Sequence, residues 1–356
     1  MNKKLKLLLV SNMYPDKTYP SFGIFVKKTK EGLEEFGFDI SDCVVMTKKS
    51  FKLTRIFFYL KFYIKIFFKV IFRSYDAIYI HFITHCSPAI FILLFFKPKM
   101  KVISNTHGSD VLRVNSKLLR YFSRIVLNKS FLIISPSKYF IKHIKSVYSL
   151  TDKNKIITFP SGGIDTDFFK PLKRSHNDEF TVGYISRIDI GKGWDILIDA
   201  INILKLKSLN LKVIMAGSGN QIDQMNTKIK ENRLEDIINY IGHIHPNDLP
   251  FFYNQFDVFI LSSILDESLG LVGLEALSCG IPVIASDKGG QISYLNQKNG
   301  ILFETGNAHE LAMKIHSISN QDLSKMKYYA RETALNYDKE KVFSELCNQL
   351  HNLLNG

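Results

Sequence analysis

The chain has 356 residues, of which 46% are hydrophobic, enough for two cores in domains of about 170 residues each. Residues 1–170 carry 29 Lys and Arg against 11 Asp and Glu, so within the total of +14 the first half is +18 and the second is −4. This imbalance predicts an anionic partner for the first half, either a phospholipid surface or a nucleic acid. The 4 cysteines are far apart and form no CxxC or Cys/His cluster, which indicates a reducing cytosolic compartment without a structural metal.

The N-terminus is basic and then apolar, a pattern that signal peptides share with a first buried strand. The apolar run stops at Ser11 and Asn12, and no small-residue cleavage site follows, so we expect a parallel-type strand over residues 6–10. A loop with two prolines and Gly23 then precedes a helical stretch over residues 24–36. A second strand is expected over residues 44–47.

The segment 48–73 holds eight basic residues and no acidic one. Lys61, Lys65, Lys69 and Arg73 step by four, which aligns them on one face of a helix otherwise rich in Phe and Ile. This spacing excludes a membrane-spanning helix, because each charge would cost about 2.5–3.5 kcal/mol at the bilayer centre. A helix in the membrane interface tolerates such charges, and each lysine near anionic lipid contributes about 1 kcal/mol. We therefore predict a membrane-facing helix; the alternative is a core helix with an exposed lysine edge.

Further strands are expected over residues 77–81, 101–106, 132–137 and 155–160, with a short buried helix over 88–96. The strand over residues 101–106 ends in the polar turn from His107 to Asp110. A parallel sheet places such a turn at its carboxyl edge, where α/β folds bind ligands. His107 is therefore a candidate site residue and Asp110 a weaker one, whereas His81 and His85 receive a structural role. The glycines of segment 161–171 permit a hinge.

The second half opens with a strand that leads into Arg187, four further residues, Lys192 and Gly193, and then a helix from Trp194. Two cations at a sheet edge beside a helix N-terminus form a plausible clamp for a diphosphate. Arginine can bind two phosphate oxygens, lysine supplies a point charge, and together they can neutralise a leaving nucleotide. A strand over residues 211–216 with a glycine turn, and strands over 238–244 and 256–262, follow.

The stretch 266–285 is typical of a loop, a short helix and a strand. Gly280 occupies the position of a left-handed helix cap, and Pro282 prevents the helix from continuing. Gly270 at the helix start leaves the N–H groups of the first turn accessible to an anion such as a diphosphate. Glu267 and Glu275 lie on either side of this helix start, where carboxylates would accept hydrogen bonds from sugar hydroxyls.

The spacing of Glu267 and Glu275, with Gly270, Gly280 and the following Pro-Val, resembles the donor-site signature of family-4 retaining glycosyltransferases of the GT-B fold. The resemblance covers nearly the whole chain and is best over residues 161–303. It implies that Glu275 lies near the ribose and Glu267 near the transferred sugar, with Gly270 and Leu271 at the donor. The sequence departs from the family at Leu269, where Phe is usual, and we expect this to alter packing against the sugar but not the reaction type.

The same resemblance implies roles for residues elsewhere in the chain. Gly23 corresponds to the glycine loop that approaches the donor phosphates and the acceptor, and His107 to a histidine that faces the transferred sugar. Arg187 and Lys192 correspond to the cations that hold the diphosphate, and the backbone of Ile241 to the segment that reads the base. No DxD metal motif in a suitable loop and no P-loop is present, so we expect neither a metal nor another cofactor.

Alternating strands and helices predict an α/β fold with two Rossmann-like domains, whose parallel sheets the GT-B resemblance places facing across an interdomain cleft. We expect an acceptor-binding domain over residues 1–170 and a nucleotide-sugar domain over 171–336. A C-terminal helix over 337–356 should return to the first domain, as GT-B chains do.

The expected activity is a metal-independent, retaining transfer of a sugar from a UDP- or GDP-linked donor to a lipid-linked or other glycan acceptor in surface polysaccharide synthesis. The enzyme should be cytoplasmic and peripherally bound to the anionic inner face of the cell membrane. A nucleotide-sugar 2-epimerase of the same fold is the enzymatic alternative. A nucleic-acid-binding protein is the alternative from another class, but no stacking platform or helix-turn-helix pattern supports it, so nucleic acid is not an expected partner.

Overall fold

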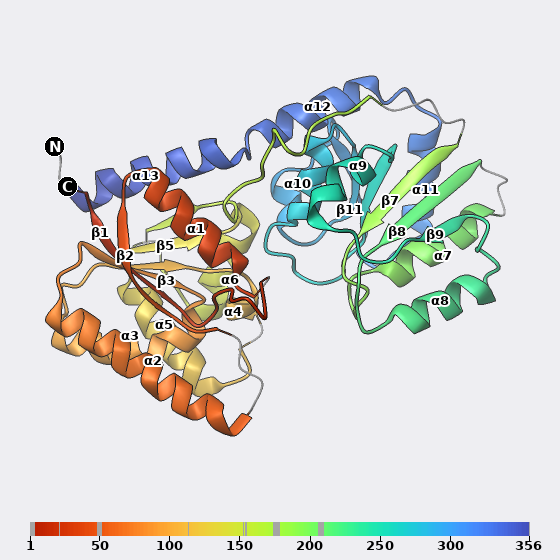
Figure 1. The fold of residues 1–356 in the computed structure, drawn as a ribbon. Coiled ribbons are helices and arrows are strands. Elements are labelled where there is room, and N and C mark those ends of the chain that lie inside the picture. The colour runs from red at the N-terminus through yellow and green to blue at the C-terminus, as the bar shows by residue number, and fades with distance from the viewer. Residues whose placement is uncertain are drawn as a thin grey trace. The chain divides into compact units, whose positions relative to one another are not determined.

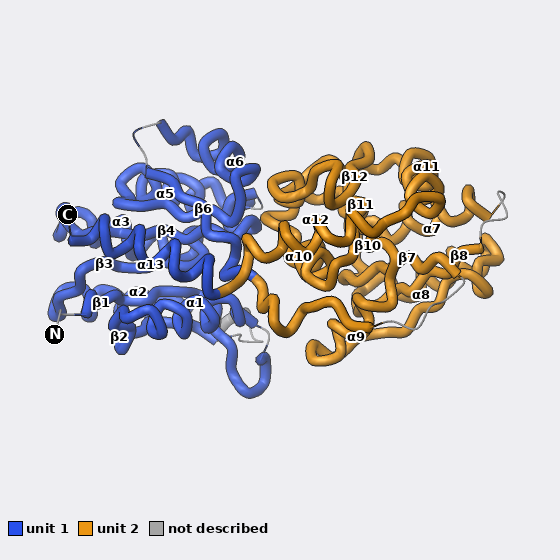
Figure 2. The backbone as a smooth tube through the Cα atoms, turned by 90° about the horizontal axis from the view of Figure 1, so that it is seen from above, with its two compact units in different colours: residues 1–163, 340–356 blue, residues 164–339 orange. Residues whose placement is uncertain are grey.

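The computed structural model describes residues 4–20, 22–47, 52–112, 114–151, 153, 155–173, 179–205 and 210–355, with side chains from residue 56 onward in the helix that begins at Lys52. The chain forms two compact units, Met1–Gly163 with Glu340–Gly356, and Ile164–Lys339 (Figure 2). Residues 164–170, which the sequence analysis placed in the first domain, belong to the second unit. Each unit contains a parallel six-stranded sheet with helices packed on it (Figure 1).

The sheet of the first unit has the order β2-β1-β3-β4-β5-β6. Its chain runs outward from β1 in one direction and from β3 in the other, so the direction of winding changes between these two central strands. The strands are β1 Lys6–Ser11, β2 Asp39–Val45, β3 Ala77–His81, β4 Val102–Asn105, β5 Leu132–Ser135 and β6 Ile156–Thr158. The helices are α1 Ile24–Glu35, α2 Lys52–Phe72, α3 Ile83–Phe96, α4 Ser109–Leu112, α5 Lys117–Lys129, α6 Lys138–Tyr148 and α13 Lys339–Asn355.

The C-terminal helix α13 packs on the first unit, although about 180 residues separate it from the rest of that unit's chain. Phe343 fits against Gly32 of α1, where an added Cβ would lie 2.3 Å from its ring, and it also contacts Phe159 edge to face. Leu346 and Leu350 are buried in the same core cluster as β1 and β3. The last turns of the chain therefore complete a core that the N-terminal residues begin.

Helix α3 starts five residues before the expected position and contains Pro88 in its interior. Proline lacks the N–H that would normally bond to the carbonyl four residues earlier, which here belongs to Thr84. The hydroxyl of Ser87 donates to that carbonyl at 2.9 Å and replaces the missing bond. The expectation that the helix begins at Pro88 was therefore wrong, because a neighbouring side chain compensates for the proline.

Helix α2 is present as predicted, but the division between its buried and exposed residues differs from the expected one. Phe62, Ile66 and Val70 are buried in the core of the first unit. The exposed positions include an apolar row in which every member is at least 46% exposed. We call this row the apolar face, and it comprises Ile56, Leu60, Ile64, Phe68 and Phe72.

Two of the four aligned cations on α2 are held by the protein itself. Lys69 and Arg73 both pair with the buried carboxylate of Asp42 on β2, and the hydroxyl of Tyr75 donates to it at 2.8 Å. Burial alone would raise the pKa of Asp42, but the hydrogen bonds from Lys69, Tyr75 and Arg73 outweigh it and hold that pKa well below its usual range. Lys69 is therefore partly buried and paired, whereas Arg73 is paired but 54% exposed, and Lys61 and Lys65 are exposed.

The second unit has the strand order β12-β11-β10-β7-β8-β9, with the change of direction between β10 and β7. The strands are β7 Phe180–Ile185, β8 Leu211–Ala216, β9 Ile238–Tyr240, β10 Val258–Leu261, β11 Val283–Ser286 and β12 Gly300–Phe303. The helices are α7 Trp194–Lys205, α8 Ile222–Glu231, α9 Leu249–Tyr253, α10 Leu271–Ser278, α11 Ala308–Ser319 and α12 Ser324–Leu335, with 3₁₀ turns η1 Pro246–Asp248 and η2 Gly290–Ser293.

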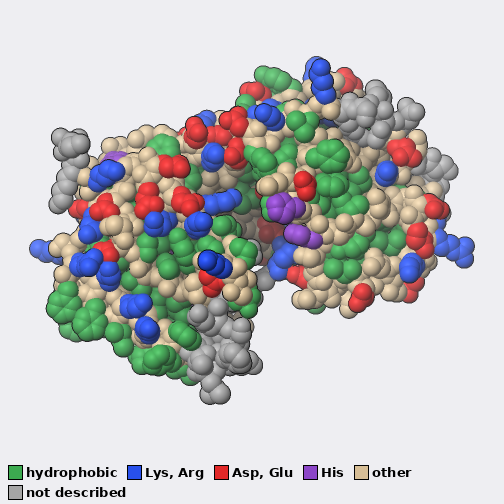
Figure 3. All heavy atoms as spheres, in the orientation of Figure 1, with side chains coloured by type: hydrophobic (Ala, Val, Ile, Leu, Met, Phe, Trp, Pro, Cys, Tyr) green, Lys and Arg blue, Asp and Glu red, His purple; other side chains and the backbone are tan. Residues whose placement is uncertain are grey.

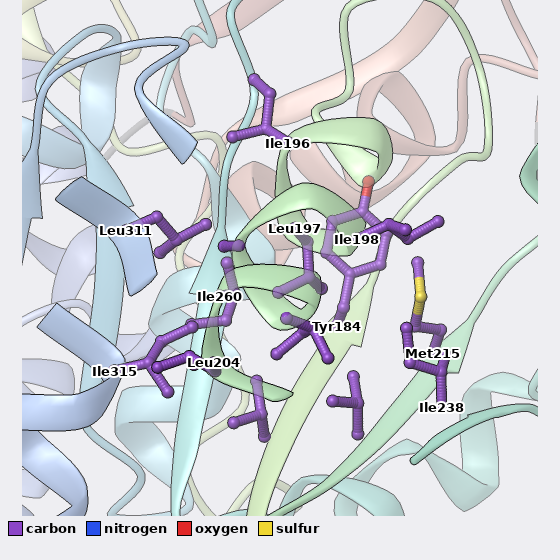
Figure 4. Close-up of a cluster of buried hydrophobic side chains, with 14 of the residues drawn as sticks. Tyr184, Ile196, Leu197, Ile198, Leu204, Met215, Ile238, Ile260, Leu311 and Ile315 are labelled. Atoms are coloured by element: carbon purple, nitrogen blue, oxygen red, sulfur yellow. The ribbon is translucent and has the colours of Figure 1, made fainter. Parts of the chain in front are cut away.

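One face of this second sheet is covered by α7 and α11. Leu197 and Leu204 of α7, with Leu311 and Ile315 of α11, point toward the sheet in Figure 4 and are fully or almost fully buried. They meet side chains such as Ile260 of β10, and their burial contributes about 1.5–3 kcal/mol for each large apolar side chain. This packing holds the strands whose carboxyl ends carry the candidate site.

Candidate functional site

The carboxyl ends of β7 and β10 bring together residues that are far apart in the sequence. Lys192, in the loop after β7, lies 2.5 Å from the carboxylate of Glu267, in the loop after β10. The hydroxyl of Ser263 donates to the same carboxylate oxygen at 3.0 Å. This is the edge of an α/β sheet where the winding changes direction, the position at which such sheets bind ligands.

A close backbone approach fixes this geometry. Gly193 has a φ of +77°, and a Cβ on it would lie 1.9 Å from the carbonyl oxygen of Ser262. The hydroxyl of Ser262 donates to the carbonyl of Gly193 at 2.7 Å. Only glycine allows the two loops to meet at this distance, because it has no side chain and adopts left-handed backbone angles freely. Because Gly193 directly follows Lys192, its contact with Ser262 places Lys192 next to Glu267.

Arg187 lies on the same loop as Lys192 but makes a different contact. Its guanidinium is 65% exposed and pairs with Asp189 at 2.9 Å. Lys192 is 14% exposed, so it is the better shielded of the two cations. Shielding from water strengthens the interaction of a charge with an anion. The diphosphate clamp predicted from these two cations stays a prediction.

Helix α10 begins as the sequence analysis expected. Gly270 is its N-cap with a φ of +79°, and Leu271 is its first residue. Gly280, which follows the helix, has a φ of +76° and provides the expected left-handed cap. The side chain of Leu269, however, is 1% exposed and belongs to the core of the second unit. The expectation that this side chain packs against a sugar was therefore wrong, because the side chain is buried in the core of the second unit.

Glu275 projects from α10 and is half buried. Its carboxylate accepts a hydrogen bond of 2.8 Å from the hydroxyl of Tyr253 at the end of α9. Burial, and then the charge of Glu275, raises the pKa of Tyr253 well above its usual value, so this tyrosine stays protonated and remains a donor. Sequence reasoning missed Tyr253, because the two residues are 22 positions apart and lie on different helices.

The backbone at the end of β9 is partly committed to the sheet. The N–H of Ile241 donates to the carbonyl of Met215 at 3.0 Å. Of the two backbone groups of Ile241, its carbonyl is therefore the one that remains to contact a ligand. The neighbouring glycine turn is tightly packed, since a Cβ on Gly217 would lie 1.7 Å from the carbonyl oxygen of Ser186.

A second segment that sequence reasoning did not nominate supports Glu267 from the other side. The N–H of Gly290 donates to the carbonyl of Glu267 at 2.7 Å. Gln291 is fully buried, and its amide nitrogen donates to the carbonyl of Ser286 at 3.3 Å. The glycine pair 289–290 after a strand could have indicated this contact from the sequence, because two glycines permit a close approach of backbone to backbone.

In the first unit, the other two predicted site residues lie at the carboxyl edge of its sheet. Gly23 is the N-cap of α1 with a φ of +73°, and a Cβ on it would lie 2.6 Å from the backbone of Met13. His107 follows β4, and the N–H of its backbone donates to the buried carboxylate of Asp110 at 2.9 Å. Burial raises the pKa of Asp110 to about 6 despite this and similar backbone hydrogen bonds. Asp110 therefore fixes the backbone of the turn that carries His107.

Comparison with known proteins bears on the second unit directly. Residues 165–333 match the family model Glycosyl transferases group 1. These residues form a glycosyltransferase domain. The match contains Arg187, Lys192, Glu267 and Glu275. It confirms the predicted enzyme class for this part of the chain.

Similar proteins extend the comparison beyond this domain. The capsular polysaccharide biosynthesis glycosyltransferase CapM of Staphylococcus aureus is 28% identical over 225 residues, which cover 59% of this chain and 56% of that protein. A GDP-mannose-dependent alpha-(1-6)-phosphatidylinositol monomannoside mannosyltransferase of Mycobacterium tuberculosis is 24% identical over 53% of this chain and 52% of that protein. The chain thus spans little more than half the length of these two relatives.

The structure of HepE from Anabaena in complex with UDP resembles the whole chain. Its TM-score is 0.74 at 18% identity, covering 98% of this chain and 100% of that chain. The complex of the same protein with UDP-glucose has a TM-score of 0.73. With two parallel six-stranded sheets, the likeness confirms the predicted GT-B fold of two Rossmann-like domains.

The close approach at Gly193 predicts a stability effect that a matched glycine will not show. Gly193→Ala should destabilise the second unit by about 3 kcal/mol or more, because a left-handed alanine costs about 1 kcal/mol and the clash with Ser262 adds overpacking. Gly306→Ala, with a φ of +87° and no neighbour within 4 Å of the added Cβ, should lose only about 1 kcal/mol. The fluorescence of the single tryptophan, Trp194, during urea unfolding measures both variants. Equal losses would show that the loops can separate without cost.

Proposed function

We propose that the chain is a retaining, metal-independent glycosyltransferase. It moves a sugar from a UDP- or GDP-linked donor to a lipid-linked glycan at the cytoplasmic face of the membrane, in the assembly of a surface polysaccharide. The observation that carries this proposal is the Lys192–Glu267–Ser263 group at the β7/β10 edge, inside the glycosyltransferase domain. A shielded cation beside a carboxylate suits a donor that is part phosphate and part sugar.

The donor is held by groups with different tasks. Lys192 and Arg187 neutralise the diphosphate as it becomes the leaving group, and the first turn of α10 at Gly270 provides N–H groups for the same anion. Glu275 accepts hydrogen bonds from the ribose hydroxyls, with Tyr253 holding the carboxylate in place. The carbonyl of Ile241 lies where it can contact the base. The structures of HepE in complex with UDP and with UDP-glucose support a uridine nucleotide as the first candidate.

The transfer occurs on one face of the donor sugar. The bond between the anomeric carbon and the phosphate oxygen breaks, and the acceptor oxygen bonds to the same carbon from the same side. The acceptor proton passes to an oxygen of the leaving phosphate, so no protein base is needed. Glu267 accepts hydrogen bonds from hydroxyls of the transferred sugar and, through Lys192, couples the position of the sugar to that of the diphosphate. Its tight pairing orients both side chains before the donor binds.

The surface of the first unit supports a lipid-linked acceptor. Hydrophobic side chains gather over α2 in Figure 3, with Lys and Arg side chains beside them. The apolar face continues onto α3, where Phe95 and Phe96 are 71% and 64% exposed and Phe96 contacts Phe67 of α2 edge to face. Monomeric soluble proteins rarely expose a contiguous apolar surface without an interaction partner. Lys61 and Lys65 lie beside this surface, which favours an anionic membrane over an apolar protein partner.

Among the described residues, no helix combines the length and the apolarity needed to cross a bilayer. Independently of this finding, we propose a peripheral attachment through the apolar face and the exposed Lys61 and Lys65 beside it. The relatives named for capsular polysaccharide synthesis and for phosphatidylinositol monomannoside mannosyl transfer favour an acceptor of this kind.

A product assay tests the proposal. Purified protein incubated with a panel of UDP- and GDP-linked sugars and lipid-diphosphate glycan acceptors should add one sugar to an acceptor, as seen by intact mass. The new linkage should keep the anomeric configuration of the donor in NMR spectra, and activity should persist in excess EDTA, because the cations of the protein carry the leaving-group charge. Conversion of the donor to its C2 epimer, without any product of higher mass, would instead identify a 2-epimerase. Activity that is lost in EDTA and restored by Mn²⁺ or Mg²⁺ would contradict the metal-free mechanism.

Removing either cation of the clamp should slow this reaction strongly. Lys192→Ala and Arg187→Ala should each lower turnover by about 10²–10³-fold, the range for losing one preorganised charge donor. The matched control is Lys228→Ala, because this lysine pairs with Asp199 of the neighbouring helix α7 at 2.7 Å. Turnover at the wild-type level in Arg187→Ala would limit the clamp to Lys192, and wild-type turnover in both variants would end the assignment.

Among the lysines tested, the membrane proposal predicts a large loss of vesicle affinity only for Lys61 and Lys65. Lys61→Gln with Lys65→Gln should lose about 2 kcal/mol of affinity for anionic vesicles, close to thirtyfold, at about 1 kcal/mol per lysine. Lys69 and Arg73 are left unchanged because Asp42 binds them. Lys138→Gln with Lys142→Gln, an exposed pair with the same spacing on α6, is the control and should lose much less.

Vesicle flotation at physiological salt measures these affinities, and activity on a short water-soluble acceptor should stay constant in all variants. Phe68→Ser with Phe72→Ser should also reduce flotation, since the aromatic rings enter the headgroup boundary. Flotation at the wild-type level by both the Lys61/Lys65 and the Phe68/Phe72 double mutants would refute the proposed membrane contact. DNA binding that is stronger than vesicle binding at equal ionic strength would favour the nucleic-acid alternative.

A further inference from the structure

Two histidines from adjacent strands form a pair at the carboxyl edge of the first sheet. His81 is the last residue of β3, and His107 lies two residues after the end of β4. Their rings are nearly parallel, with centroids 5.0 Å apart and an interplanar angle of 15°, and they meet edge to edge, since Nδ1 of His81 lies 2.8 Å from Nε2 of His107. From the sequence, His81 is expected to be structural, with a place near the acceptor as the alternative, because nothing in the sequence shows that the two side chains meet.

The surroundings of the pair exclude water from His81 and keep both rings uncharged. His81 is fully buried, between the rings of Tyr79 and Phe25, and Phe25 also packs on His107 with centroids 4.3 Å apart. Burial lowers the pKa of His107 to about 3, and burial together with His107 lowers the pKa of His81 well below its usual value. Asp110 faces the backbone here and accepts the N–H groups of His107 and Ile83.

Two neutral rings that share one hydrogen bond have two arrangements. Either Nδ1–H of His81 donates to Nε2 of His107, or Nε2–H of His107 donates to Nδ1 of His81. In the first arrangement the remaining proton of the pair lies on Nδ1 of His107. In the second it lies on Nε2 of His81. The environment of this last atom therefore decides between them.

Nε2 of His81 is buried, and the described residues offer it no hydrogen-bond partner. A buried N–H without an acceptor is rarer in proteins than a buried acceptor without a donor. The first arrangement is therefore favoured, because it leaves only a lone pair on this nitrogen. His107 then carries its proton on Nδ1, for which the described part of the chain likewise supplies no hydrogen bond, and His107 is only partly buried.

We propose that His81 is a positioning residue that donates from Nδ1 to His107 and thereby holds His107 as the neutral Nδ1–H tautomer. His107 then presents an N–H donor at the carboxyl edge of the first sheet to an oxygen of a substrate sugar, a role that rests on the proposed glycosyl transfer. In this tautomer His107 cannot remove a proton through Nδ1, and as a neutral ring it does not act as an acid. The proton of the acceptor is left to the phosphate, in agreement with the proposed reaction.

The tautomer is measured on the full chain without any substrate. Two-bond ¹H–¹⁵N correlation spectra of ¹⁵N-histidine-labelled protein at pH 7 should show His107 with a protonated Nδ1 and an unprotonated Nε2. The spectrum of His107→Asn identifies the signals. A protonated Nε2 on His107 would overturn the proposal, whatever the activity of the protein. This readout also separates the two proposals, since a correct tautomer in a protein that transfers no sugar would refute only the proposed function.

Two substitutions of His81 separate positioning from packing. The amide nitrogen of His81→Asn can occupy the place of Nδ1 and donate the same hydrogen bond, whereas His81→Leu fills the space without a donor. We expect His81→Asn to keep the Nδ1–H tautomer and most of the activity. His81→Leu should give mixed tautomers of His107 and a kcat about 10–100-fold lower, with little change in the KM for the nucleotide sugar.

Far-UV circular dichroism controls for folding of both variants. If His81→Leu fails to fold, the wild-type spectrum and His81→Asn still decide the matter. Loss of the Nδ1–H tautomer in folded His81→Asn, or equal kcat in folded His81→Asn and His81→Leu, would show that His81 acts only by filling space.

Discussion

The approach of the loop after β7 to the loop after β10, at Gly193 and Ser262, is the constraint on which the geometry of the candidate site depends. Because the backbone of one loop touches the backbone of the other, neither can move without losing the hydrogen bond between Ser262 and Gly193. Lys192 precedes Gly193, and Glu267 lies in the same loop as Ser262. The contact between the two loops therefore fixes the distance between these two side chains. A charged pair fixed in this way costs less ordering when a ligand arrives than one built on free side chains.

In the first unit, as in the second, the ends of neighbouring parallel strands bring side chains together, but the side chains are of a different kind. Parallel neighbours end at the same edge of a sheet, so the residues that follow them must meet there. In the second unit this brings together a cation and an anion, and in the first it brings together two neutral histidines. The difference follows from burial, since His81 is enclosed by aromatic rings while the Lys192–Glu267 pair keeps partial access to water. The Lys192–Glu267 pair presents opposite charges at its sheet edge, and the histidine pair presents a hydrogen bond between two uncharged rings.

Local features of the fold could be predicted because single residues determine them. Gly270, Gly280 and Pro282 mark the ends of α10 through backbone angles that other residues rarely adopt, and the helix lies between them as expected. The pairing of Lys192 with Glu267 could not be predicted, because 75 residues separate them and their meeting depends on strand order. The same holds for the aromatic partner of Glu275, which belongs to another helix. The residue types in a sequence indicate which chemistry is available, whereas the strand order determines which of these residues come into contact.

Helix α2 shows why periodicity alone leaves its orientation open. The lysine row and the apolar row both step by four and lie next to each other around the helix, so either could have faced the protein. In the structure neither row faces the core, but Lys69 and Arg73 at the end of the lysine row pair with Asp42 on β2, because a buried carboxylate needs cations. The apolar row then has no place in the core and remains on the surface. The face that α2 buries is a third row, Phe62, Ile66 and Val70, so apolar packing orients the helix and the pairs with Asp42 fix its C-terminal end.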